Sequence, residues 1–244
     1  MIAECYIITI STNIESFDAA KRCISTGKKF GLHINFFSAY TPIHNPLKIL
    51  KDKGVNTNGF KDIEKHSHGD AAAGCFLSHF TLWEKCIELN KPIIIFEHDA
   101  VIIDKIPSFI LDGTGFEKLV NIGTPGHDEY KIPKFTGVGL LYSSWRGSFG
   151  EYCTQFKGTH AYAIKPAGAL AVIAQAKKST TAADMFFNSI NFPFLEELYP
   201  WPVTVEPRFT TIQRGTSLSG CGLPRATSEY GPFARLDEFG KARE

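Results

Sequence analysis

The sequence predicts an α/β domain with a mostly parallel central sheet flanked by helices. Short apolar runs alternate along the chain with segments whose apolar residues recur every three or four positions, as expected where strands alternate with helices. Residues 93–96 are Ile-Ile-Ile-Phe, a run typical of a strand buried on both faces of a parallel sheet. The 244 residues are enough for one large domain of this class with a proper core.

The N-terminal half begins with an apolar run followed by a helix pattern. The hydroxyl of Ser16 can cap this helix, and Asp70 can cap a second, longer one. Residues 40–68 are polar, carry several prolines and glycines, and predict a long irregular connection. In chain order, the predicted elements are a strand at 5–10, a helix at 16–26, a strand at 34–38, a short helix near 47–51, a helix at 70–89 and the strand at 93–96.

Beyond residue 100 the predicted elements are shorter. Residues 123–156 are rich in glycine and aromatic residues, and a loop of this length inside a compact domain is usually functional or mobile. Pro166 fits the first turn of a helix, where its missing N–H is not needed. The predicted elements here are an apolar continuation at 101–103, strands at 118–122 and 160–164, a helix at 166–177 and a helix beginning within 185–190.

The composition is that of an ordinary soluble globular protein, with 43% hydrophobic and 21% charged residues. A formal net charge of +1 gives no overall attraction to nucleic acid or to a membrane surface. We find neither an apolar stretch long enough to span a membrane nor a signal-peptide pattern, and therefore expect a cytoplasmic protein. The six cysteines contain no C-x-x-C pair, so we expect reduced thiols rather than a zinc site.

The strand at 93–96 runs directly into two carboxylates. Side chains alternate along an extended chain, so Glu97 and Asp99 share one side of it. Carboxylates at the C-terminal end of such a strand lie where open α/β sheets bind ligands. Two converging oxygen ligands suit a divalent cation, Mn²⁺ or Mg²⁺, that also grips a diphosphate, which points to nucleotide-sugar chemistry. The alternative is a strand that simply ends in a polar turn.

The helix before this strand carries a more specific pattern. Residues 71–86 read AAAGCFLSHFTLWEKC, and together with the apolar strand and its acidic end they resemble the signature of the family 25 glycosyltransferases, often labelled lipopolysaccharide-biosynthesis enzymes. That signature is G-C-x-L-S-H-x-x-x-W followed by a strand ending in E-D-D. His98 replaces the central Asp, and an imidazole is a softer ligand than a carboxylate. Compact relatives with E-H-D also look like enzymes carried by tailed phages.

Two further blocks support this resemblance. Residues 158–169 look like the family's G-x-x-A-Y-x-I-x-P-x-G-A block, and residues 5–10 with 36–40 look like its first strand and a later F-x-A element. The similarity spans about residues 4–215. It implies a GT-A-like, Rossmann-type glycosyltransferase domain at residues 1–215, followed by a Gly-rich polar tail at 216–244.

The resemblance implies roles for residues in these blocks. Glu97 and Asp99 would hold the metal, and Asp99 would act in catalysis. For some residues an alternative stays open: Ser78 can bond back to its own helix, and His79 can be a hydrogen-bonded structural residue. The residues expected to bind the nucleotide-sugar donor are Ile8, Thr9, Ser11, Ser78, His79, Glu97, His98 and His160.

The resemblance also implies an inverting, direct-displacement reaction, which needs a carboxylate as general base for the acceptor hydroxyl. Asp184 is the candidate, because the family carries an Asp in the corresponding region. The alternative is that Asp184 caps the helix that follows it. Glu196 and Glu197 are second candidates, although they are better explained as an exposed helix face.

The acceptor is less determined by the sequence. A UDP-sugar is the expected donor and a cell-surface glycan the expected acceptor, while hydroxymethylated pyrimidines in DNA, a protein or a small molecule remain alternatives. DNA would need basic and aromatic residues beside the site. A degenerate domain that binds the donor without turnover is a further alternative, suggested by His98. Candidates for stacking or phosphate contacts are Trp145, Phe149, Tyr152, Arg208, Thr211, Gln213 and Arg214.

Overall fold

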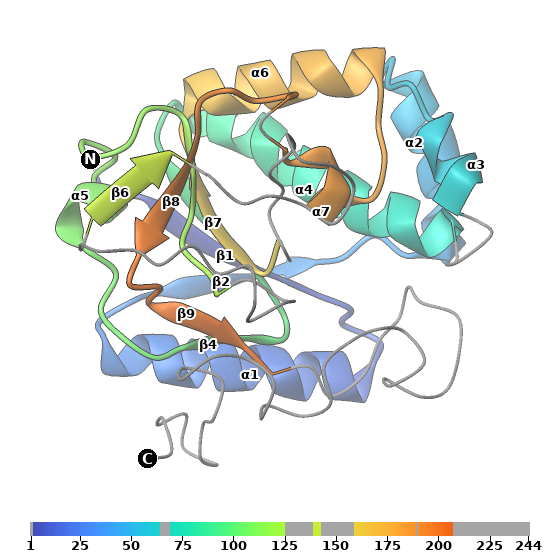
Figure 1. Ribbon diagram of the computed structural model, residues 1–244. Helices are drawn as coiled ribbons and strands as arrows, with labels where there is room; N and C mark the ends of the chain where they lie inside the picture. Colours follow the sequence, from blue (N-terminus) through green and yellow to red (C-terminus); the bar gives the residue numbers. More distant parts are fainter. Residues whose placement is uncertain (1, 64–68, 125–138, 143–158, 189, 207–244) are drawn as a thin grey trace, which may run out of the picture.

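The computed structural model describes residues 2–63, 69–124, 139–142, 159–188 and 190–206. Within these residues, seven strands form one sheet with helices on both faces (Figure 1). The strand order is β2-β1-β3-β7-β5-β8-β6. The strands are β1 (Glu4–Thr9), β2 (Ile34–Ser38), β3 (Ile93–Glu97), β5 (Leu119–Asn121), β6 (Gly139–Tyr142), β7 (Ala161–Ile164) and β8 (Leu195–Tyr199).

Five of the seven described strands run in the same direction. β1 pairs in parallel with both β2 and β3, and β5 pairs in parallel with β8. β7 is antiparallel to β3 and to β5, which therefore share one direction, and β6 is antiparallel to β8 at the sheet edge. The α/β class and the mostly parallel sheet predicted from the sequence are confirmed.

Helices cover the two faces of the sheet unequally. The long helices α4 (Gly69–Leu89) and α6 (Pro166–Lys178) lie over one face, and α1 (Ile14–Lys29) lies over the other (Figure 1). Beside α1, β4 and β9 pair antiparallel as a separate ribbon. The remaining described elements are η1 (Pro42–His44), α2 (Pro46–Asp52), α3 (Gly59–Ile63), β4 (Ala100–Ile102), α5 (Ser108–Leu111), α7 (Ala183–Phe186) and β9 (Val203–Val205).

Strand β3 divides the hydrophobic core. Ile93 and Ile95 pack in the cluster under α4 and α6, whereas Ile94 and Phe96 pack in the cluster under α1. All four side chains are fully buried, as expected where side chains alternate between two covered faces. The apolar run therefore forms the doubly buried strand that it predicts, and its end brings Glu97 to the edge of the sheet.

Two helices begin differently from the sequence prediction. The cap of α1 is Asn13, whose side-chain oxygen accepts a hydrogen bond from Ser16 N at 2.8 Å. The Ser16 hydroxyl is used elsewhere, because it accepts a bond from Ile10 N at 2.9 Å. Helix α4 begins at Gly69, so Asp70 lies in its first turn and not at its cap.

Several short segments also correct the sequence prediction. The described part of the connection, residues 40–63, contains three short helical segments rather than one, and the helix expected from 185–190 is the single turn α7. Residues 139–142, expected in a loop, form β6. Glu196 and Glu197 lie on strand β8, where Glu197 is 1% exposed, so the exposed helix face is wrong. The expected domain boundary at 215 and the tail at 216–244 lie outside the described residues.

Candidate active site

The carboxyl ends of β1, β2 and β3 meet at one edge of the sheet. The register pairs Ile8 with Glu97 and Thr9 with Ser38. The antiparallel strand β7 begins at the same edge, because Ala161 pairs with the residue before Glu97. Ligands of open α/β sheets bind outside the carboxyl ends of the parallel strands. A ligand site is therefore expected at this edge.

Glu97, the last residue of β3, is held through one oxygen of its carboxylate. Oε1 accepts hydrogen bonds from His79 Nε2 at 3.1 Å and from Thr159 Oγ1 at 2.5 Å. Oε2 has no hydrogen bond within the described part of the chain, and the side chain is 25% exposed. Burial alone would raise the pKa of Glu97, but His79 and Thr159 lower it to about 2. The carboxylate is therefore ionised at neutral pH.

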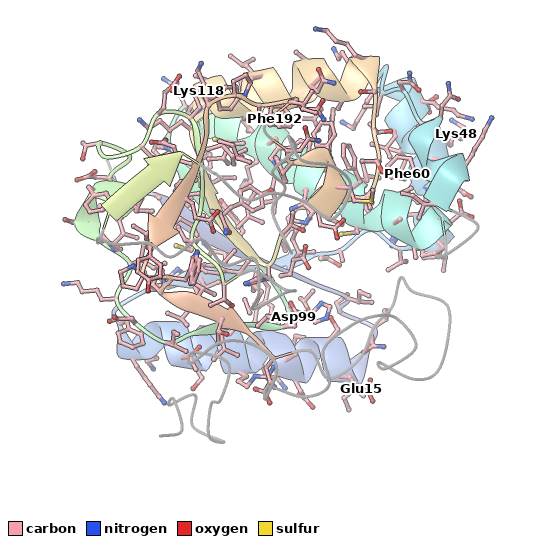
Figure 2. All side chains as sticks on the ribbon, viewed as in Figure 1. Glu15, Lys48, Phe60, Asp99, Lys118 and Phe192 are labelled. Atoms are coloured by element: carbon pink, nitrogen blue, oxygen red, sulfur yellow. The ribbon has the colours of Figure 1, made fainter. Side chains whose placement is uncertain are left out.

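Asp99 lies in the turn between β3 and β4, between the sheet and α1 (Figure 2). Its Oδ1 atom is buried and finds no hydrogen-bond partner among the described residues. Burial raises the pKa of Asp99; the charge of Glu97 also raises it, while His98 and His160 lower it. A buried carboxylate oxygen without a partner costs free energy unless a cation or a donor joins it. The turn thus presents an unsatisfied oxygen beside an ionised carboxylate.

His160 lies next to this turn. Its backbone carbonyl accepts a hydrogen bond from Glu97 N at 2.9 Å, and its side chain is 3% exposed. Among the described residues, Nε2 has no hydrogen-bond partner. The ring packs on Gly123, where an added Cβ would lie 2.4 Å from Nε2. Burial lowers the pKa of His160, against the raising effect of Asp99, so its ring is neutral at pH 7.

A chain of buried side chains supports Glu97 from the α4 side. Trp83 Nε1 donates to the Tyr162 hydroxyl at 2.9 Å, and this hydroxyl lies 2.9 Å from His79 Nδ1. His79 Nε2 then reaches Glu97. His79, Trp83 and Tyr162 are each 0% exposed. Side chains from α4, β7 and β3 thus converge on one carboxylate at the edge of the sheet.

Residues 4–187 match the family model described as glycosyltransferase family 25 (LPS biosynthesis protein). This match covers more than half of the chain. The chain belongs to glycosyltransferase family 25. No curated protein matches it. Membership makes it a glycosyltransferase, an enzyme that takes a nucleotide-sugar donor and a glycan acceptor.

In this family 25 glycosyltransferase, the motif helix is fixed against the chain that follows β2. Ser78 Oγ donates to Gly74 O at 2.8 Å and accepts from Tyr40 N at 2.9 Å, and the side chain is fully buried. An added Cβ at Gly74 would lie 2.6 Å from Tyr40 O. Gly74 therefore permits a close approach of α4 to this segment. Ser78 therefore bonds back to its own helix, as the alternative prediction has it, and also ties α4 to the segment after β2.

Three residues in or after β1 that were expected to bind the donor lie at the same edge of the sheet. Ile8 is 6% exposed and packs in the α4 core cluster. Thr9 is buried, with Oγ1 3.1 Å from Ser16 Oγ, while Ser11 is exposed and lies 3.2 Å from Ser38 Oγ. Of these three, Ser11 is the side chain that reaches solvent, and Ile8 and Thr9 shape the backbone beside Glu97.

Asp184 lies near the same carboxylates. It is exposed in the first turn of α7, where Ala182 and not Asp184 is the N-cap residue. Burial raises the pKa of the Cys75 thiol well above its ordinary value, and the negative charges of Glu97, Asp184 and Asp99 raise it further. The charges of all three carboxylates therefore act on one thiol. Asp184 is accessible for an acceptor on the same side of the molecule.

Cys75, His79 and Glu97 form a cluster that could hold a metal ion. Their ligand atoms lie within 4.8 Å of one another. This cluster differs from the Glu97–Asp99 pair, because its atoms are already engaged: His79 Nε2 bonds Glu97, and the raised pKa keeps the Cys75 thiol protonated. A hard cation such as Mg²⁺ or Mn²⁺ prefers oxygen ligands. Among the described residues, the carboxylate pair suits such an ion better.

Some site residues carried no signal in the sequence. Thr159 donates to Glu97 but precedes the predicted strand without a motif of its own. Tyr162 lies in a recognised block, yet its contact with α4 appears only in the fold. The aromatic and polar candidates at residues 145, 149, 152, 208, 211, 213 and 214 lie outside the described residues.

Within the described residues, no helix is both long and apolar enough to cross a membrane.

Proposed function

We propose that this family 25 enzyme is a metal-assisted, inverting glycosyltransferase that uses a UDP-sugar and transfers the sugar to a hydroxyl of a glycan. The observation that carries the proposal is the pair of carboxylate oxygens without hydrogen bonds among the described residues, Glu97 Oε2 and Asp99 Oδ1. Both lie where the parallel strands end. Glycosyl transfer needs positive charge at this position, because a diphosphate leaves with its negative charges.

The residues of the turn fit a divalent cation, Mn²⁺ or Mg²⁺. Glu97 is ionised at neutral pH, and Asp99 offers a buried oxygen whose desolvation a cation would offset. Glu97 and Asp99 would hold the ion, with His98 in the turn between them. When bound, such an ion neutralises charge on the leaving diphosphate. This arrangement supports the expected metal roles of Glu97 and Asp99.

The donor is proposed to lie along the edge formed by β1, β3 and β7. Ser11 is an exposed polar residue after β1, and His160 lies directly before β7, beside Asp99. The neutral ring of His160 can donate or accept one hydrogen bond to a donor sugar or phosphate. Ile8, Thr9, Ser78 and His79 are proposed to act by holding this edge in place, since their side chains are buried.

The proposed general base is Asp184. Inversion by direct displacement requires one carboxylate that takes the proton of the acceptor hydroxyl as the new bond to the sugar forms. Asp184 is exposed, and its charge acts on the same thiol as the charges of Glu97 and Asp99. An acceptor hydroxyl between Asp184 and the donor sugar would therefore meet a base on one side and the leaving diphosphate on the other.

A glycan is proposed as the acceptor because the family is described by lipopolysaccharide biosynthesis. Modified DNA stays the alternative acceptor; the aromatic and basic residues that bear on it lie outside the described residues. The matched test is sugar transfer from one donor to a lipopolysaccharide core oligosaccharide and to DNA with hydroxymethylated pyrimidines. Transfer to DNA alone would replace the glycan proposal.

The first experiment is a thermal-shift screen with UDP-, GDP- and CMP-sugars, each with and without Mn²⁺. A ligand at about 100 times its Kd adds roughly 2.7 kcal/mol to the free energy of unfolding, an easily measured shift. We expect a shift with a UDP-sugar that depends on Mn²⁺ in the wild type and is lost in Asp99→Asn. A thermal shift that is the same with and without Mn²⁺ would refute the metal-assisted mechanism. Donor binding without sugar transfer would identify a degenerate domain.

A further inference from the structure

The hydrogen bonds that end on Glu97 have a direction. The indole N–H of Trp83 can only donate, so the Tyr162 oxygen accepts from it at 2.9 Å. Glu97 is a carboxylate and can only accept, so His79 Nε2, at 3.1 Å, must carry a proton. In a neutral imidazole the other nitrogen, Nδ1, is then an acceptor, and the Tyr162 hydroxyl at 2.9 Å donates to it. Every proton in the chain thus points from Trp83 towards Glu97.

We propose that Trp83, Tyr162 and His79 are positioning residues that fix His79 as the Nε2–H tautomer and thereby commit Oε1 of Glu97 to the protein, leaving Oε2 for a divalent cation. This inference rests on the proposed metal-assisted function. This chain of hydrogen bonds is shielded from solvent, since all three residues are fully buried. Protein groups and not bulk solvent therefore set the orientation of the Glu97 carboxylate.

Thr159, two residues before β7, adds a second hydrogen bond to Glu97. Its hydroxyl donates to the same oxygen, Oε1, at 2.5 Å. Two donors on Oε1 and none among the described residues on Oε2 make the two oxygens of one carboxylate inequivalent. Outer groups that orient a metal ligand in this way are typically worth 10–100-fold in metal affinity.

The same geometry argues against the Cys75–His79–Glu97 cluster as a metal site. An ion there would need the lone pair of His79 Nε2, which the directed chain places in an N–H bond to Glu97. It would also need the Cys75 thiolate. Binding would therefore release the Cys75 thiol proton, move the His79 proton from Nε2 to Nδ1 and break the bond that orients Glu97. His79 Nε2 can donate to Glu97 or bind a metal ion in this cluster, but it cannot do both at once.

The variant Tyr162→Phe tests the proposal, because it removes the hydroxyl and keeps the ring. We expect Mn²⁺ alone, measured by EPR titration of free Mn²⁺ on the full chain, to bind about tenfold or more weakly. The matched control is Tyr6→Phe, which removes a hydroxyl that donates to the carboxylate of Glu4 at the other end of β1. Trp201→Phe is the second control, since it removes an indole N–H that donates to Glu197 at 2.8 Å. Both controls should bind Mn²⁺ as the wild type does.

A second measurement needs no variant. Long-range ¹⁵N–¹H NMR on histidine-labelled wild type should show His79 as the Nε2–H tautomer. A proton on Nδ1 would overturn the proposal, and so would unchanged Mn²⁺ affinity in a folded Tyr162→Phe protein. Absence of Mn²⁺ binding by the wild type would instead refute the metal ion of the proposed function. The hydrogen bonds from Trp83, Tyr162 and His79 would then have no metal ligand to orient. These failures are therefore distinguishable.

Discussion

Two glutamates of the same sheet, Glu97 on β3 and Glu197 on β8, differ in whether their position leaves the carboxylate accessible to a ligand. Each accepts two hydrogen bonds at Oε1: Glu97 from His79 and Thr159, and Glu197 from Asn121 at 2.7 Å and Trp201 at 2.8 Å. The Glu97 side chain is 25% exposed, whereas Glu197 is 1% exposed.

The difference follows from where each residue lies along its strand. Glu97 is the last residue of β3 and is followed two residues later by Asp99, whose Oδ1 has no partner among the described residues. Glu197 is in the middle of β8, under the Trp201 side chain. A buried carboxylate satisfied by an amide and an indole stabilises a fold. One at a strand end beside an unsatisfied oxygen is available to a ligand.

The largest effect is expected at the unsatisfied oxygen. Asp99→Asn should reduce sugar transfer by about a thousandfold or more, since a bound metal supplies several kcal/mol of charge stabilisation. Its melting temperature at pH 7 should nevertheless rise, because the raised pKa shows that ionised Asp99 costs stability. Initial rates and thermal unfolding measure the two effects.

The sign of this stability gain can be checked with pH. A raised folded-state pKa means that the cost of Asp99 is fully present above that pKa and disappears below the ordinary value of 3.8. The advantage of Asp99→Asn should therefore shrink as the pH falls. An Asn variant that is less stable than wild type at pH 7 would contradict this reading of the turn.

The next effect compares the two glutamates directly. Glu97→Gln should lower transfer by about a hundredfold, because it removes the charge but keeps an acceptor for His79 and Thr159. Glu197→Gln keeps an acceptor for Asn121 and Trp201 and should leave transfer within about twofold. Rates measured under one set of conditions decide this, and equal losses in both variants would break the comparison.

A smaller effect is expected on acid stability. The pKa of Glu97 is about 2 in the folded chain, below its ordinary value of 4.5. Its contribution to the free energy of unfolding is therefore complete above about pH 4.5 and is lost as the pH falls towards 2. Urea unfolding at several pH values should show the gap between wild type and Glu97→Gln narrowing in this window. A constant gap would mean that the pKa of Glu97 is not lowered by folding.

The smallest effect concerns the support of the site. Gly74→Ala places a Cβ 2.6 Å from Tyr40 O and should cost about 1–3 kcal/mol, as overpacking does. For a domain of this size, each kcal/mol lowers the melting temperature by about 2–4 °C. Leu170→Ala is a suitable control, because Leu170 is exposed on α6. An unchanged melting temperature for Gly74→Ala would show that this contact can relax.

The sequence contained the parts of the fold that depend on local pattern. The run at 93–96 predicts a doubly buried strand, and its alternation between two core clusters confirms this. The antiparallel direction of β7 could not be predicted, because a short apolar strand has the same pattern in either direction. Strand β8 was missed because its two adjacent glutamates indicate exposure, whereas Asn121 and Trp201 satisfy one of them inside the protein.

For the site, the sequence supplied residues but not their contacts. His79 and Trp83 are four positions apart on a helix, so their shared face follows from helical spacing. Tyr162 is 79 residues beyond Trp83, and its hydroxyl meets both only because β7 pairs with β3. The partners of Ser78 are likewise set by tertiary packing against Tyr40. Long-range hydrogen bonds of this kind have no local signature.

The most direct test of the central claim is anomalous X-ray diffraction from crystals of the wild type grown with Mn²⁺ and UDP. We expect a manganese ion in contact with the carboxylates of Glu97 and Asp99, with the diphosphate on the same ion. Manganese bound at the Cys75–His79–Glu97 cluster, or UDP bound elsewhere than at the carboxyl ends of β1 and β3, would contradict it.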